Sequence, residues 1–115
     1  MKTELEDRTK RFSVDVVRAV RTFPKVIDGW EVGRQLLRSA TSIGANYREA
    51  NRAESKADFI HKIGLAEKEA SETGYWLEIC GDSGIGAPAK IKALLAESVE
   101  LLAILTTIGR KAKGR

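Results

Sequence analysis

Few residues in this chain could carry catalytic or metal chemistry. His61 is the only histidine and Cys80 the only cysteine. A zinc site of histidine and cysteine ligands needs more of these residues within one chain, and a Ser-His-Asp triad would depend entirely on His61. A di-metal site in a helical bundle uses Glu-x-x-His pairs, and no glutamate lies three residues before His61. We therefore predict a protein that is not an enzyme and that binds no metal or cofactor.

The remaining reactive residue types have ordinary structural interpretations. Cys80 cannot form a disulfide within the chain, and its apolar helical context predicts a small buried side chain. His61 is expected on a helix, exposed or half-buried. The glycines of GDSGIG, residues 81–86, lack the lysine of a P-loop and a preceding strand, which favours a turn between helices over a phosphate site.

The segment between Arg34 and Arg52 most strongly invites a functional interpretation. At 100° per residue a helix would place its residues in stripes. The arginine stripe contains Arg34, Arg38, Thr41, Ala45, Arg48 and Arg52, and the small polar stripe contains Gln35, Ser39, Ser42, Asn46 and Glu49. An apolar stripe follows, with Gly44 on its far side. Small polar residues weaken a helix by some tenths of a kcal/mol and glycine by about 1 kcal/mol, so we expect another helix of the bundle, or of a neighbouring subunit, to pack there. An exposed polar face is the alternative.

An acidic flank on the next predicted helix could face the arginine stripe. It contains Asp58, Leu65, Glu69, Glu72 and Trp76. If the arginine stripe of one chain contacted this flank on another chain, the contact would be heterologous and could close into a ring. Pairing within one chain explains the same charges equally well.

Helix-breaking residues and the helical spacing of apolar residues divide the chain into four segments. Pro24 ends the first segment, Ser55 with Asp58 resembles a helix cap, and Pro88 suits a first helical turn. Apolar residues recur at three-four spacing in each segment. We predict one domain, residues 1–115, that is an all-α antiparallel up-down four-helix bundle with helices at about 4–23, 29–54, 56–81 and 88–111.

Composition supports a folded chain that lies outside membranes. Hydrophobic residues make up 43% of the 115 residues, which is enough for a core, and no apolar stretch approaches the roughly 20 residues of a membrane span. The first residues, MKTELEDRTKR, are charged where a signal peptide is apolar, so we expect a cytoplasmic protein. The net charge is +4, with basic residues concentrated near the C-terminus.

Three motifs resemble the bacterial four-helix-bundle proteins of the 23S rRNA intervening-sequence family, also called the S23 ribosomal protein family. They are QLLRSATSIGANYREA (35–50), SKADFIHKI (55–63) and KEASETGYWLEI (68–79). The family pattern falls on Ser42, Gly44, Asn46, Glu49, Glu69, Glu72, Tyr75 and Trp76, whereas Glu67 stands where relatives commonly have an apolar residue. The resemblance implies a homopentameric ring. A relative, the accessory variability determinant of diversity-generating retroelements, binds a reverse transcriptase and nucleic acid. The ribosomal label records where some of the genes reside and does not establish a ribosome component.

Two functions follow as expectations. The first is a non-catalytic oligomeric scaffold or adaptor with a protein partner, in which the interface or structural polar residues are Gln35, Ser42, Gly44, Asn46, Glu49, Glu69, Glu72 and Trp76. The alternative is a basic ring that binds nucleic acid, with RNA the first candidate. Its contacts would be Arg34, Arg38, Arg48 and Arg52, or the tail residues Arg110, Lys111, Lys113 and Arg115.

Overall fold

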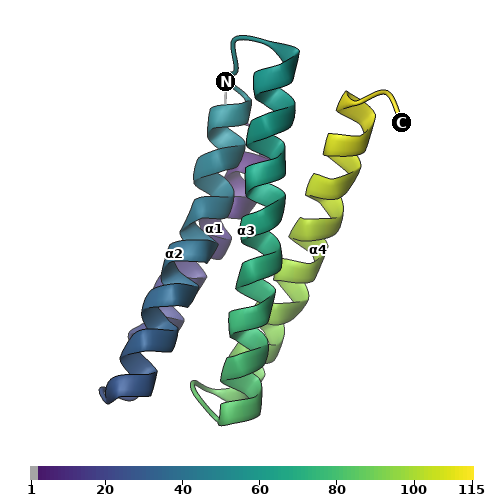
Figure 1. Ribbon diagram of the computed structural model, residues 1–115. Helices are drawn as coiled ribbons and strands as arrows, with labels where there is room; N and C mark the ends of the chain where they lie inside the picture. The colour runs from purple at the N-terminus through teal and green to yellow at the C-terminus, as the bar shows by residue number, and fades with distance from the viewer. Residues whose placement is uncertain (1–2) are drawn as a thin grey trace.

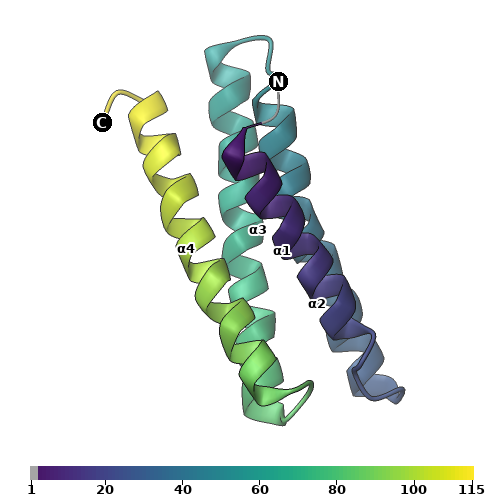
Figure 2. The ribbon, with the colours of Figure 1, turned by 180° about the vertical axis from the view of Figure 1, so that it is seen from behind.

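The computed structural model describes residues 3–115, which form four helices in an elongated bundle of 44 × 24 × 22 Å. The helices are α1 (Glu4–Val20), α2 (Ile27–Ala50), α3 (Lys56–Ser83) and α4 (Pro88–Ala112). Consecutive helices run antiparallel and are joined by short turns, with α1 behind α2 and α3 in the view of Figure 1 and in front of them in Figure 2. The predicted up-down four-helix bundle is confirmed. None of the helices within residues 3–115 is long and apolar enough to cross a membrane.

Capping residues define where three of the helices begin. The Thr3 hydroxyl accepts a hydrogen bond from the Glu6 amide at the start of α1, and the Ser55 hydroxyl accepts one from the Asp58 amide at the start of α3, both at 3.0 Å. Pro88 lies in the first turn of α4. The predicted Ser55 cap and the position of Pro88 are therefore confirmed. Ser55 gives a partner to an amide that the helix itself leaves unbonded, and Pro88 has no amide hydrogen that would need one.

Two predicted helices were too long, and local turn chemistry explains both differences. α1 ends at Val20 rather than at residue 23, because Thr22 and Phe23 donate to carbonyls three residues back and Pro24 disfavours a helical residue before it. α2 spans 27–50 rather than 29–54, and the amides of residues 52 and 53 again bond three residues back. Asp28 and Gly29 lie inside the first turn of this helix. The ends of α3 and α4 differ from the prediction by no more than two residues.

The apolar stripes of the sequence form the core. The apolar stripe of α2 consists of Leu36, Ala40, Ile43, Tyr47 and Ala50, and all five side chains are buried. Residues from the other three helices complete the core, including Val16, Leu77 and Leu105. Burial of a Leu, Ile or Val side chain contributes about 1.5–3 kcal/mol, so this core is the main source of stability.

Glycines on α2 allow α1 to approach closely. A Cβ atom on Gly44 would lie 3.0 Å from the Thr9 hydroxyl oxygen, and one on Gly33 would lie 3.1 Å from a methyl carbon of Val20. Both distances are shorter than ordinary side-chain contacts, so the separation of α1 and α2 depends on these two residues. The close contact with α1 therefore explains why glycine occupies position 44.

Candidate functional site

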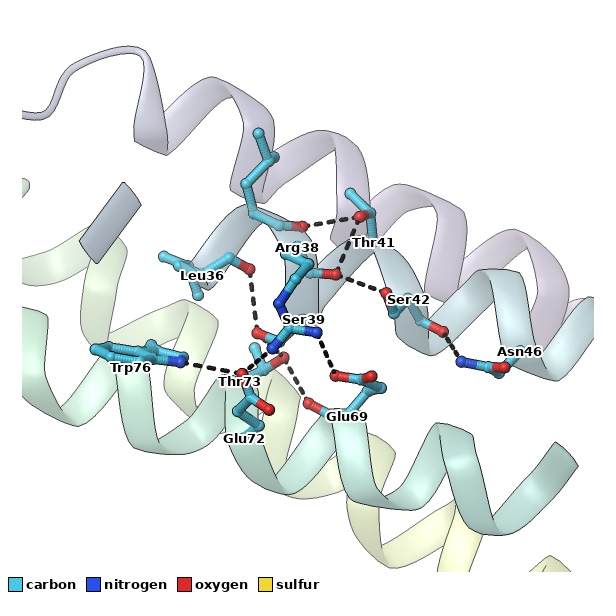
Figure 3. Close-up of polar contacts among 11 residues, drawn as sticks. Leu36, Arg38, Ser39, Thr41, Ser42, Asn46, Glu69, Glu72, Thr73 and Trp76 are labelled. Atoms are coloured by element: carbon cyan, nitrogen blue, oxygen red, sulfur yellow. Dashed lines mark hydrogen bonds and ion pairs between the residues drawn. The ribbon is translucent and has the colours of Figure 1, made fainter. Parts of the chain in front are cut away.

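The small polar stripe of α2 meets α3 through one buried pair of hydroxyl groups. The oxygens of Ser39 and Thr73 lie 2.9 Å apart, and both side chains are fully buried (Figure 3). Each hydroxyl also lies within hydrogen-bonding distance of a carbonyl oxygen of its own helix, that of Leu36 or Glu69. Because each hydroxyl already has a partner in its own helix, the contact between them adds one buried hydrogen bond, of about 0.5–1.5 kcal/mol, to the packing of α2 against α3.

Beside this pair, Arg38 of α2 binds the acidic flank of α3. Its guanidinium donates to the carboxylates of Glu72 and, at 3.5 Å, Glu69 (Figure 3). The hydrogen bond to Glu72 is the main cause of a raised Arg38 pKa. The Trp76 indole also donates to Glu72, at 3.3 Å. Sequence reasoning left open whether these charges pair within one chain, and here they do.

Two other arginines of the stripe also face carboxylates of the same chain. Arg34 donates to Glu31 at 2.7 Å, and this bond, with one from Gln35, lowers the pKa of Glu31. Arg48 lies 3.8 Å from the buried carboxylate of Glu6. Most of the arginine stripe is therefore neutralised locally, which leaves it a weaker polyanion site than its sequence indicates.

The remaining polar residues of α2 point along the helix or into water. Ser42 donates to the Arg38 carbonyl at 2.7 Å, and Asn46 donates to the Ser42 carbonyl at 2.9 Å (Figure 3). Both residues are half-buried, and Glu49 is exposed. Gln35 and Ser42 bond within α2, to Glu31 and to the Arg38 carbonyl, whereas Gly44 lies against α1.

The basic tail is separate from the arginine stripe. Arg110 and Lys111 lie in the last turn of α4, and Lys113 and Arg115 follow it. All four side chains are exposed, and no ion pair of theirs is present within residues 3–115. These charges are therefore available to a polyanion.

An ion-pair cluster between α1 and α4 was not predicted from the sequence. Arg8 donates to both oxygens of Glu97, at 2.7 and 2.8 Å, and to Glu100 at 3.2 Å. The hydrogen bond from Arg8 lowers the pKa of Glu97, and the same bond raises the pKa of Arg8. The residues lie 89 positions apart, so no local pattern in the sequence indicates the pair.

Cys80 and His61, the residues considered for catalysis, lie in different environments. Cys80 is fully buried, and burial raises the pKa of its thiol to about 11; His61 is exposed. Across the described part of the chain, no group of three or more His, Cys, Asp or Glu side chains could hold a metal ion. Glu67, which departs from the family pattern, accepts a hydrogen bond from Thr106 at 3.0 Å beside Gly109. A threonine and a glycine on α4 thus accommodate its carboxylate.

Large apolar side chains remain exposed in places that sequence reasoning missed. Trp30 is 64% exposed and Ile27 83% exposed at the start of α2, and Tyr75 is 56% exposed on α3. A groove of about 540 Å³ also runs between α1 and α2, with Val14 and Val17 among its lining residues. The three-four spacing gave no signal for these residues because they lie outside the core stripes.

The fold defines a small four-helix bundle with ion pairs between its helices, exposed apolar side chains and a groove between α1 and α2. The chain belongs to the family described as 23S rRNA-intervening sequence protein, whose sequence model matches residues 1–107. It is similar to a crystal structure from Bacteroides thetaiotaomicron VPI-5482, described as a protein with unknown function from the S23 ribosomal protein family. The two chains are 35% identical, with a TM-score of 0.81 over 91% of this chain and 97% of the other. None of the curated proteins compared with the chain matched it.

Proposed function

We propose that the protein is a cytoplasmic, non-catalytic scaffold that assembles with copies of itself and binds a protein partner. The observation that carries this proposal is the exposure of Trp30, Ile27 and Tyr75, which a single bundle leaves in water. Aromatic side chains are enriched at the centres of protein interfaces, where burial makes them the strongest contributors to binding. Contact with protein surfaces would remove these side chains from water.

The charge pattern supports protein contacts over nucleic-acid contacts on α2. Arg34, Arg38 and Arg48 each face a carboxylate of their own chain. A phosphate group that approached these arginines would have to compete with those carboxylates. The family resemblance adds a homopentameric ring as the assembly that we propose.

The molecular mass in solution tests the assembly. Sedimentation equilibrium at several protein concentrations is expected to give a multiple of the single-chain mass, five under the ring proposal. Moderate salt should leave an assembly with apolar contacts largely intact, since screening weakens exposed charges most. A single-chain mass at every concentration would contradict the proposal.

Nucleic-acid binding is the second candidate function, because the exposed basic tail has no ion pair within the described residues. A ring would superpose the fields of several tails. Binding to mixed-sequence RNA and DNA should then fall steeply between low and moderate salt. Neutralising the tail, at Arg110, Lys111, Lys113 and Arg115, should reduce both the affinity and the salt dependence. The control neutralises the arginine stripe, in which Arg34, Arg38 and Arg48 are ion-paired, and should change binding less. Affinity that does not respond to the tail substitutions would exclude this candidate.

A further inference from the structure

We propose that the groove between α1 and α2 of one subunit receives the outer face of α3 from the next subunit. This inference rests on the proposed homo-oligomeric function and names the two surfaces that meet. The groove and the α3 face have opposite charge, and both expose apolar side chains.

The groove combines an apolar floor with a basic rim. Val14, Val17 and Ala45 contribute apolar atoms to its lining, and the volume of about 540 Å³ is enough for several side chains. The rim contains four basic residues, Lys10, Arg18, Arg21 and Arg48. One carboxylate also lines the groove, that of Glu6, and it is buried and already accepts a hydrogen bond from Asn51 at 2.8 Å. The groove therefore suits an acidic surface with apolar side chains.

The outer face of α3 has that composition. Glu67, Glu69 and Glu72 of α3 are half-buried and bond to Thr106 or Arg38 of the same chain, so the exposed carboxylates of this helix are those of Glu78 and Asp82. Tyr75 is 56% exposed and packs edge-on against the half-buried Trp76, with ring centroids 5.1 Å apart. Glu78 and Asp82 lie exposed beyond this aromatic pair. An aromatic anchor followed by two exposed carboxylates complements an apolar floor with a basic rim.

The placement of the two surfaces requires a second copy of the chain. Among the described residues, α3 packs against α2 and α4 but not against α1, which lies behind it in Figure 1 and in front of it in Figure 2, and no residue of α3 lines the groove of its own chain. A contact between two different surfaces is heterologous, and repetition of it closes a ring when the rotation between subunits allows. Each subunit would then supply one groove and one α3 face.

A helix face fits this groove better than a nucleic acid or an extended peptide does. Phosphates would satisfy the basic rim but would leave Val14 and Val17 without apolar partners. An extended peptide needs free backbone groups to pair with, and the groove walls are helices, whose interior backbone groups are bonded within the helix. A helix forms its backbone hydrogen bonds internally, so only its side chains would contact the groove.

The test uses one exposed substitution on each surface and measures mass by sedimentation. Ala45→Glu places a carboxylate in the groove, and Tyr75→Lys removes the aromatic anchor and adds a like charge to face the rim. Each variant alone is expected to fall to the single-chain mass. The matched controls lie on the exposed side of α4, Ala103→Glu and Val99→Lys, and should keep the wild-type mass; Val99 is 58% exposed, close to Tyr75.

Mixing the two variants provides the decisive result. Ala45→Glu protein retains a sound α3 face and Tyr75→Lys protein retains a sound groove, so an equimolar mixture should form a one-to-one dimer and nothing larger. A mixture that stays monomeric, or single variants that keep the wild-type mass, would overturn the inference while leaving the scaffold proposal intact. A monomeric wild-type protein would instead overturn the scaffold proposal itself.

A measurement on the wild-type chain keeps the inference testable if a variant does not fold. An amine-specific cross-linker applied to a mixture of isotopically light and heavy protein should join Lys10 of one subunit to Lys68 of another. Circular dichroism identifies any variant that has lost helix. If cross-links between subunits instead join other helix pairs and none connects α1 to α3, the inference fails. Single-stranded RNA that blocks the Lys10 cross-link would assign the groove to nucleic acid instead.

Discussion

Gly44→Ala should destabilise the protein, although alanine is the better helix former. The gain in helix propensity is about 1 kcal/mol. Against it, the new methyl group would lie 3.0 Å from the Thr9 hydroxyl oxygen and 3.2 Å from the Thr9 Cβ atom. Thr9 is 1% exposed, and its hydroxyl lies 2.9 Å from the Leu5 carbonyl oxygen, so it has little freedom to move aside. Overpacking costs about 1–3 kcal/mol, which leaves a net loss of about 1 kcal/mol.

Urea denaturation at one fixed protein concentration measures this loss, because assembly makes stability depend on concentration. Gly64→Ala is the matched control: Gly64 also lies in a helix, and nothing lies within 4 Å of the position of its new methyl group. It should gain up to about 1 kcal/mol. Thr9→Ala combined with Gly44→Ala should recover part of the loss, because the contact with the hydroxyl oxygen disappears while the contact with the Cβ atom remains. If Gly44→Ala stabilises the protein as much as Gly64→Ala does, the close approach of α1 to α2 is wrong.

Two further predictions concern ionisable groups in the bundle. Arg8→Met should cost about 1 kcal/mol at pH 7, since the pair with Glu97 is half-buried and bidentate. Because the folded state lowers the Glu97 pKa, this stability is present above the ordinary glutamate value of 4.5 and is lost as the pH falls through the lower folded pKa. The cost of Arg8→Met should therefore shrink at pH 3, and a cost that is equal at both pH values would contradict the pairing. Cys80, with a thiol pKa raised to about 11, should not react with a disulfide reagent at pH 8 until urea unfolds the chain. Rapid reaction of the folded protein would show that the thiol is accessible.

Local signals in the sequence predicted most of the fold. The stripe from Leu36 to Ala50 follows helical spacing, and Ser55 marks a helix start by its own chemistry, so neither depends on distant residues. Helix ends were less predictable. After α1, backbone amides bond to carbonyls three residues earlier, and many different sequences can form such a turn. Gly44 was placed correctly beside the apolar stripe, but the spacing could not identify α1 as its neighbour.

The candidate surfaces were predicted only in part, because they depend on pairing between distant segments. Charges on α2 and α3 indicated an interaction, yet the choice between contacts within a chain and between chains required the positions of Arg38 and Glu72. The pair between Arg8 and Glu97 joins the first helix to the last and has no local signature. The exposure of Trp30 could not be predicted from the sequence, because a tryptophan near the start of a helix can lie either in the core or on the surface.

Native mass spectrometry of the wild-type chain, with and without single-stranded RNA, tests the central claim most directly. A scaffold built by protein contacts should give one assembly of identical subunits in both samples, five copies under the ring proposal, with no requirement for RNA. A monomer in both samples, or an assembly that forms only when RNA is added, would contradict the claim.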